Sequence, residues 1–336
     1  MTHSSSFSPA TGKLDKLRTL WTRRDFSSLA IEVERYVYWQ RLRIQEQLGM
    51  LAPQDAPRRL AEDEFWDASD IDEVREGSWL TLGQGILGLW ALQAMADGIT
   101  DIMDLIRGLL ATEGPRRGLA MGCGDMVAEI GMFTHPALPF SHVEGHDISF
   151  VSLQRAQQLC QAQGLPASFV ITDANRLQLP ADHYDLIVCN HAFHHFTEID
   201  HVAAQINRAL KPGGVFTTFD YVGERFQQYS DAQLAYANQI NRLLPYHLRR
   251  RANGLVRTVV ERPNPAGLSP DEAICADLIL PALDHHLSVQ YQYNWAGLLM
   301  PLLEEISPNF HGPKHHDLNH QVDEESLALL RLLFDL

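Results

Sequence analysis

The sequence predicts an α/β protein in which a doubly wound, mostly parallel sheet follows a helical extension. Short apolar segments alternate with helical segments between residues 114 and 222. Several of these apolar segments end at a glycine or a polar residue, and residues 14–110 show only helical spacing. Strands joined by single-helix crossovers form parallel sheets with helices on both faces. The chain therefore divides into a disordered start at 1–12, a helical extension at 13–112 and a sheet domain at 113–336.

Five segments have the length and apolar composition of strands. They are Gly118–Met121, Ser141–His146, Ser168–Ile171, Tyr184–Cys189 and Val215–Phe219. The intervening helices are predicted at Val127–Phe133, Phe150–Gln163 and Ile199–Leu210.

Helical periodicity also marks both ends of the chain. In the extension it covers Phe26–Leu48, Leu60–Val74 and Thr81–Leu110. After the sheet it covers Asp231–Leu244, Asp271–Leu280, Trp295–Ile306 and Glu324–Phe334. A further strand is expected at Leu287–Tyr293, where apolar and polar residues alternate.

Composition narrows the classes of partner. The 336 residues include 27 Lys+Arg and 42 Asp+Glu, so the formal net charge is 27 − 42 = −15. Nucleic acids and anionic membranes are bound by clustered basic residues, so neither partner is expected. Four widely spaced cysteines need no disulfide framework, and no apolar leader or long apolar span is visible. The sequence therefore predicts a soluble cytoplasmic protein, and it leaves the oligomeric state open.

A glycine-rich turn follows the first predicted strand in the segment R-G-L-A-M-G-C-G-D-M. Gly122 and Gly124 allow a tight turn and a close approach of the main chain to a ligand. A helix expected to begin near Asp125 would point free N–H groups at that ligand. Met126 stands where a third glycine is common, and it either narrows the ligand pocket or packs in the core.

Polar residues end the next three strands. Asp147 ends the second strand, Asp173 the third and Asn190 the fourth. Because parallel strands end at one edge of a sheet, these residues are expected to meet in one crevice.

This ordered set resembles the class I S-adenosylmethionine-dependent methyltransferases, with a Rossmann-like fold, over about residues 117–222. An NAD-binding Rossmann domain fits less well, because it would prefer a third glycine and does not account for Asp173. The resemblance implies S-adenosylmethionine as cofactor and a small-molecule acceptor, with a place in secondary metabolism. It implies that the cofactor is bound by residues of four loops. These are Gly122 and Gly124 (methionine moiety), Asp147 (ribose), Asp173 and Ala174 (adenine), and Asn190 (sulfonium, also a catalytic candidate), with Cys123 and Ile148 as further cofactor-binding residues.

The candidate catalytic residues follow the fourth and fifth strands. His194 and His195 come directly after Asn190, and a histidine with its ordinary pKa near ~6.5 suits a general base. The alternative is that one or both histidines have no catalytic role and only hold the loop in place by hydrogen bonds. Asp220 and Tyr221 end the fifth strand and are candidates to contact the acceptor. Three histidines lie close together here when His191 is counted, but no metal site is expected.

Aromatic residues are frequent in the helical extension. They either form a helical core or belong to a lid, in which Tyr36, Tyr38 and Trp39 would line the substrate pocket and attract the sulfonium. A histidine tract near the C-terminus is expected to be a solvated loop. It consists of His311, His315, His316 and His320.

Two alternatives to methyl transfer remain open. The first is a cyclase like the azetidine-2-carboxylate synthases, which resemble class I methyltransferases with an N-terminal helical lid. These enzymes cyclise the aminocarboxypropyl arm of S-adenosylmethionine and release methylthioadenosine. A non-catalytic protein that binds the cofactor is the other alternative, and the complete set of Gly122, Gly124, Asp147 and Asp173 disfavours it.

Overall fold

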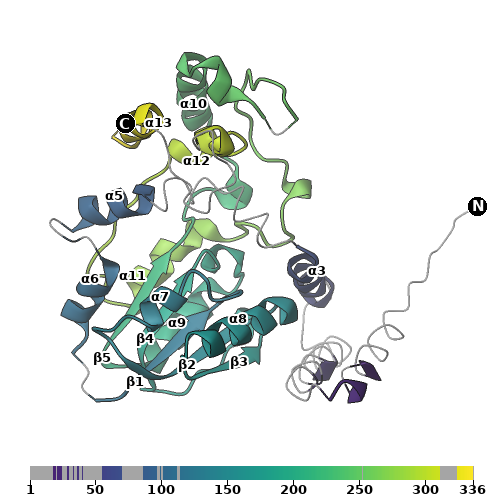
Figure 1. Cartoon of the computed structure of the whole chain (residues 1–336), viewed down its shortest axis with the longest axis vertical. Helices are drawn as coiled ribbons and strands as arrows, with labels where there is room; N and C mark the ends of the chain where they lie inside the picture. The colour runs from purple at the N-terminus through teal and green to yellow at the C-terminus, as the bar shows by residue number, and fades with distance from the viewer. Residues whose placement is uncertain are drawn as a thin grey trace, which may run out of the picture.

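The computed structural model describes residues 55–69, 86–96, 99, 101–111, 114–251, 253–310 and 324–335, with scattered residues between 18 and 40. The predicted disordered start, the helix at Phe26–Leu48 and the histidine tract lie outside the described residues, apart from a few positions of that helix. Figure 1 shows the sheet in the lower half of the molecule, with helices from the C-terminal part of the chain above it.

A five-stranded, fully parallel sheet forms the centre of the fold. Its strands are β1 (Arg116–Met121), β2 (Phe140–Asp147), β3 (Ala167–Ile171), β4 (Tyr184–Asn190) and β5 (Leu210–Phe219). The order β3-β2-β1-β4-β5 places the reversal of strand order between β1 and β4. In such sheets, ligands bind at the carboxyl ends of the strands beside this reversal. The predicted fold class and all five predicted strands are confirmed.

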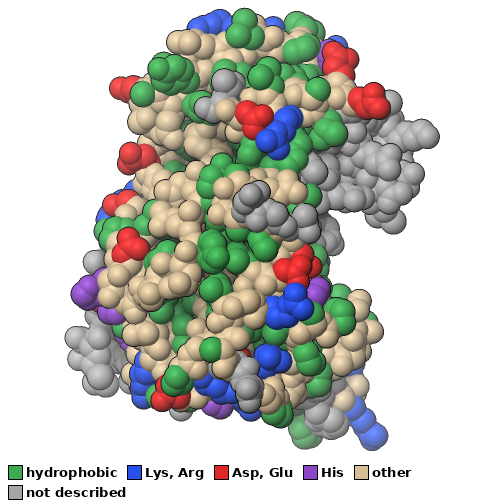
Figure 2. All heavy atoms as spheres, turned by 90° about the vertical axis from the view of Figure 1, so that its left-hand side faces the viewer, with side chains coloured by type: hydrophobic (Ala, Val, Ile, Leu, Met, Phe, Trp, Pro, Cys, Tyr) green, Lys and Arg blue, Asp and Glu red, His purple; other side chains and the backbone are tan. Residues whose placement is uncertain are grey.

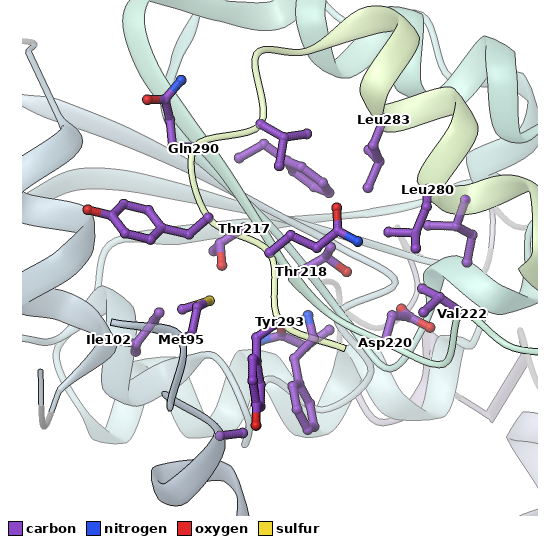
Figure 3. Close-up of a pocket in the computed structure, with 18 of the residues that line it drawn as sticks. Met95, Ile102, Thr217, Thr218, Asp220, Val222, Leu280, Leu283, Gln290 and Tyr293 are labelled. Carbon is purple, nitrogen blue, oxygen red and sulfur yellow. Dashed lines mark hydrogen bonds between the residues drawn. The ribbon is translucent and has the colours of Figure 1, made fainter. Parts of the chain in front are cut away.

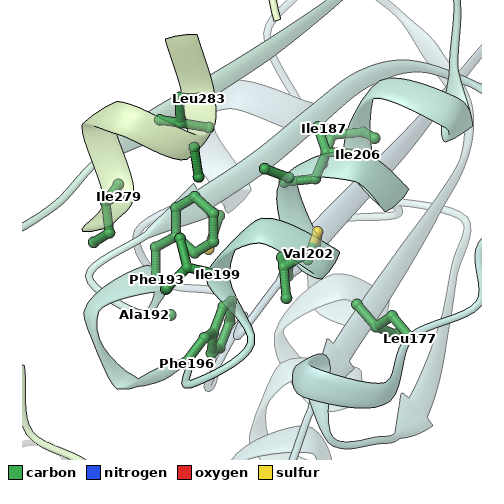
Figure 4. Close-up of a cluster of buried hydrophobic side chains, with 14 of the residues drawn as sticks. Leu177, Ile187, Ala192, Phe193, Phe196, Ile199, Val202, Ile206, Ile279 and Leu283 are labelled. Carbon is green, nitrogen blue, oxygen red and sulfur yellow. The ribbon is translucent and has the colours of Figure 1, made fainter. Parts of the chain in front are cut away.

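Alternate residues of the central strands pack on opposite faces, as the period of two for a strand requires. Leu119 and Ile187 face α9 (Ile199–Ala209) and α11 (Ile279–His286), and Figure 4 shows part of this cluster. Ala120 and Leu186 face the opposite cluster. That cluster includes side chains from α6 (Ile102–Leu109), α7 (Ile130–Phe133) and α8 (Phe150–Ala162). The sheet is therefore covered on both sides and holds the strand ends rigidly.

A third apolar cluster lies above the sheet and joins α5 (Ile86–Met95) to the C-terminal helices. These helices are α10 (Asp231–Leu243), α12 (Leu299–Leu303) and α13 (Glu324–Phe334). The prediction for α13 is confirmed, and that for α10 differs by one residue.

Several predicted helices have different bounds in the structure. The segment Thr81–Leu110 was expected to be one helix, but α5 and α6 are separate, because Asp101 caps α6 by accepting the Met103 N–H at 2.8 Å. The helix predicted at Leu60–Val74 is α3 (Asp55–Ala68), and residues 70–74 lie outside the described part.

Two further predictions were wrong because of proline. In place of Asp271–Leu280, the helix is α11, which puts Pro281 in its first turn. In place of Trp295–Ile306, only α12 is α-helical, with Pro301 in its first turn. A proline is tolerated in the first turn, where its missing N–H has no intrahelical partner.

Candidate active site at the carboxyl edge of the sheet

The turn after β1 requires glycine at its first position. Gly122 has φ +58°, and a Cβ there would lie 2.3 Å from the Cβ of Ala192 in the loop after β4. Gly124 has φ +49°, but a Cβ there would meet nothing within 4 Å. The turn is thus pressed against the β4 loop at Gly122 and borders open space at Gly124. That space is where the main chain can approach a bound molecule.

Asp147 holds this turn in place. Its carboxylate accepts the Gly124 N–H at 2.8 Å and the Ser149 N–H at 2.7 Å. Burial raises the pKa of Asp147, although these N–H groups act in the opposite direction. Each carboxylate oxygen keeps acceptor capacity for a ribose hydroxyl. Ile148 follows directly, whereas the Cys123 side chain is buried and packs toward Gly145, so only its main chain borders the turn.

The helix expected near Asp125 does not begin there. Residues 124–129 form turns, and α7 starts at Ile130. Both Gly124 and Met126 have positive φ, which a right-handed helix excludes. The Met126 side chain is fully buried in the core beside α7 and α8. The core alternative for Met126 is therefore confirmed, and the predicted row of free N–H groups is wrong.

A buried acid, Glu129, joins the two central loops. The side chain of Asn190 hydrogen-bonds to it, and Asn190 Oδ1 also accepts the Phe219 N–H at 3.1 Å. Burial is the main cause that raises the pKa of Glu129 to about 8, and nearby Asp125 and Asp147 add to it. With this pKa, Glu129 is largely protonated at neutral pH, so a ligand beside Gly124 would border a neutral carboxylic acid at this position.

Asp173 is in contact with the helical extension. It caps the short 3-10 helix that begins at Ala174 by accepting the Asn175 N–H at 2.9 Å. Its other oxygen lies 2.6 Å from the Arg59 guanidinium of α3, and both side chains are only 3% exposed. The predicted contact of Asp173 and Ala174 with adenine stays a prediction, and Arg59 would border the same place.

Further contacts hold α3 over this edge. Asp67 binds the Ser149 hydroxyl at 2.9 Å, and Glu62 accepts the Asp271 N–H at 3.0 Å. Figure 1 shows α3 beside α8 and the ends of β2 and β3. Among the residues predicted to form a lid, Tyr36 is 42% exposed, and Tyr38 and Trp39 lie outside the described residues.

His194 and Asp220 form a buried pair after β4 and β5. Asp220 accepts His194 Nδ1 at 2.5 Å and also the main-chain N–H groups of Ala192 and Phe193. Burial lowers the pKa of His194, but the charges and hydrogen bonds of Asp220 and Glu272 outweigh it and raise the pKa to about 10. His194 is therefore protonated at neutral pH, which does not suit the general base expected from the sequence.

His195 lies against residues that the sequence interpretation did not identify. Its Nδ1 is 3.3 Å from Glu62 and 3.3 Å from the Ser269 hydroxyl, and its Nε2 faces Glu272. Glu272 in turn accepts a hydrogen bond from Gln227 at 2.6 Å. No local motif marks these partners, because they come from segments before and after the strands.

A cavity of about 1420 Å³ opens beside these residues and runs along β5. Asn190, His194 and Asp220 lie among its lining residues, and Tyr221 lines it while its hydroxyl donates to the Glu224 carbonyl. Much of the lining is apolar, including Met95, Ile102, Leu280, Leu283 and Val222. Figure 2 shows hydrophobic side chains gathered in the middle of this side of the molecule.

The strand predicted at Leu287–Tyr293 is absent. This segment has no regular secondary structure, is largely exposed, forms no ladder with β5, and lines the cavity across from it (Figure 3). Alternating apolar and polar residues show that the segment has an apolar side and a polar side, but a strand also needs a neighbouring strand at hydrogen-bonding distance. The cavity takes that place beside β5.

Comparison with known proteins assigns the central part of the chain. Residues 119–218 match the family described as "Methyltransferase domain". The uncharacterized methyltransferase YcgJ of Bacillus subtilis is 30% identical over 34% of this chain and 46% of its own length. Its crystal structure has a TM-score of 0.32 at 23% identity, covering 46% of this chain and 60% of that one. The demethylmenaquinone methyltransferase of Thermus thermophilus is 26% identical over 34% of this chain and 50% of its own length.

The sheet, the glycine turn and the family match define residues 119–218 as a class I S-adenosylmethionine-dependent methyltransferase domain. The cofactor assigned by this family is S-adenosylmethionine, and the open space at Gly124 beside the Asp147 carboxylate leaves room for a bound molecule. The chain spans about half the length of the curated relatives named above. Among the described residues, no helix is long and apolar enough to cross a membrane.

Proposed function

We propose that this protein transfers the methyl group of S-adenosylmethionine to a small, largely apolar acceptor. The observation that carries this proposal is the apolar cavity beside β5, which reaches Asn190 and Asp220 at the carboxyl edge. An acceptor lying in this cavity would present one end next to the cofactor loops. The Thermus relative, whose name gives demethylmenaquinone as its substrate, supports an acceptor with a large apolar part.

The residues at the edge would align the two reactants. Gly122, Gly124 and Asp147 would hold the methionine and ribose parts of the cofactor, and Glu129 would position the Asn190 side chain beside them. When bound, S-adenosylmethionine supplies an activated methyl group, so the protein needs chiefly to position the acceptor and exclude water. Asp220 would act through His194 and the loop after β4, because its carboxylate is taken up by protein groups.

The same proposal includes the class of acceptor and the cellular compartment in which the protein works. A net charge of −15 disfavours nucleic-acid acceptors. Cys123, Cys160, Cys189 and Cys275 are free thiols, which suits the reducing conditions of the cytoplasm. A role in secondary metabolism rests on the sequence resemblance alone.

We further propose that α3 is a lid over the cofactor. Its contacts with Asp173, Ser149 and Asp271 support this, because they join the extension to the ends of β2 and β3 and to the segment that contains Glu272. Replacing Arg59 by Ala is expected to speed hydrogen exchange in residues 55–69 by about tenfold or more, as ~1.4 kcal/mol of lost docking would do. Exchange that stays unchanged in Arg59→Ala, while Arg107→Ala serves as the exposed control, would contradict the lid.

The experiment that tests the reaction is incubation with S-adenosylmethionine, followed by mass identification of the adenosyl product. S-adenosylhomocysteine formed only when apolar hydroxyl- or carbonyl-bearing acceptors are added is the expected result. Methylthioadenosine released without any acceptor would instead select the cyclase. Cofactor binding without turnover across a broad acceptor panel would favour the non-catalytic alternative.

A further inference from the structure

Two histidines and a glutamate meet at the carboxyl edge with the spacing of metal ligands. His194 Nε2 lies 3.5 Å from Glu272 Oε1, and His195 Nε2 lies 3.7 Å from Glu272 Oε2. Both distances exceed those of ordinary N–H···O hydrogen bonds. They are close to the separation of about 3.4 Å between two ligand atoms that each lie about 2.1 Å from a tetrahedral ion.

The other ring nitrogen of each histidine faces a carboxylate. Nδ1 of His194 is bound by Asp220, whose side chain is fully buried. Nδ1 of His195 lies 3.3 Å from Glu62. A carboxylate that accepts the outer N–H of a histidine fixes its tautomer and directs Nε2 toward a metal. The Nε2 atoms of both histidines therefore lie near Glu272, and one ligand atom from each of the three residues lies within 4.8 Å of the others. Binding of a metal ion would displace the proton that His194 Nε2 otherwise carries.

An unsatisfied amide oxygen lies beside the same group. The Gln227 side chain is buried, and its Nε2 donates to Glu272 at 2.6 Å, but its Oε1 has no hydrogen-bond partner in the described structure. Phe226 and Gln227 have φ of 54° and 52°, a left-handed conformation that costs free energy for residues other than glycine. This strained turn delivers an amide oxygen, which is a suitable partner for a cation or its bound water.

We propose that His194, His195 and Glu272 bind one divalent transition-metal ion, of the Zn²⁺ or Fe²⁺ class. Two imidazoles and one carboxylate are a donor set for these ions, and three protein ligands leave coordination positions open. His194 and Gln227 line the cavity, so the open positions would face it. The role of the ion rests on the proposed function: the ion would take an oxygen atom of the acceptor as a further ligand. The acceptor would then carry a hydroxyl or enol oxygen next to the methyl donor.

Metal binding can be tested on the full chain without any acceptor. The protein is stripped with dipicolinate, dialysed against Co²⁺, and examined by elemental analysis and visible absorption. Wild-type protein is expected to bind one Co²⁺ more than Glu272→Gln or His195→Gln and to show a visible band that both variants lose. Their Co²⁺ affinity at this site should fall by more than about tenfold. His286→Gln is the matched control, because it disrupts the exposed Asp200–His285–His286 group and should leave the band unchanged.

The outcomes separate the metal site from the methyltransferase proposal. Equal Co²⁺ content and equal spectra in wild type and Glu272→Gln, or no visible band in wild type, would overturn the metal site. If Glu272→Gln fails to fold, His195→Gln and the wild-type spectrum decide. Calorimetry with S-adenosylmethionine on the same samples completes the test. Wild type that binds Co²⁺ as expected but not S-adenosylmethionine would support the metal site and contradict the proposed function.

Discussion

The two sides of the carboxyl edge are built from different kinds of contact. On the cofactor side, Asp147 binds the main chain of Gly124, only 23 residues away. On the acceptor side, His195 meets Glu62 and Glu272, which come from α3 and from the turn before α11. The cofactor side is a single strand–turn–helix–strand unit, so a short sequence motif is enough to predict it. The second side exists only when distant segments fold together, so its chemistry is hidden from any local pattern.

The largest effect is expected for Asp220→Ala on the acceptor side. The change leaves buried N–H groups of Ala192 and Phe193 and the protonated His194 without their acceptor. Removing one partner of a buried ion pair costs about 3–5 kcal/mol of unfolding free energy. Urea unfolding measures it, and Asp277→Ala, which breaks an exposed pair with Arg225, should cost at most about 1 kcal/mol. Similar costs for the two variants would show that Asp220 does not anchor this side.

The next largest effect is expected at the glycine turn of the cofactor side. Gly122→Ala combines a left-handed backbone with a contact of 2.3 Å to Ala192, and should cost about 2–5 kcal/mol. Gly124→Ala has the backbone penalty alone, about 1–2 kcal/mol, because its Cβ enters open space. Thermal unfolding of both variants checks the difference. Equal destabilisation would refute the close approach of the two loops at Gly122.

The two sides of the edge also differ in how well the sequence predicts them. The strand β4 was predicted to within one residue because its buried side chains form a continuous apolar run. The glycines and Asp147 were found because strand, turn and acid follow each other in order. Alternation at Leu287–Tyr293 was misinterpreted, since lining a cavity produces the same pattern as a strand. Glu272 and Gln227 carry no local signal, because they reach the histidines from segments that follow the five strands in the sequence.

A smaller effect concerns pH and tests Glu129, which joins the two sides. Burial raises its pKa in the folded state to about 8, above the unfolded value of 4.5. Between these values the folded state holds a proton that the unfolded state has lost, so this residue makes stability fall as pH rises. From pH 6 to pH 7.5, Glu129 should lower the unfolding free energy by about 1–2 kcal/mol.

Glu129→Gln removes this titration while it keeps a similar shape. Unfolding free energies of wild type and Glu129→Gln should therefore differ by an amount that changes with pH over this range. A difference that stays constant from pH 6 to pH 7.5 would show that Glu129 is ionised throughout.

The central claim is that the cofactor side binds S-adenosylmethionine through Asp147. Isothermal titration calorimetry of wild type and Asp147→Ala tests it most directly, with exposed Asp284→Ala as control. We predict that wild type and Asp284→Ala bind S-adenosylmethionine alike and that Asp147→Ala loses about 1–3 kcal/mol of binding free energy. Absence of binding to wild type, or equal affinity in all three proteins, would contradict the account.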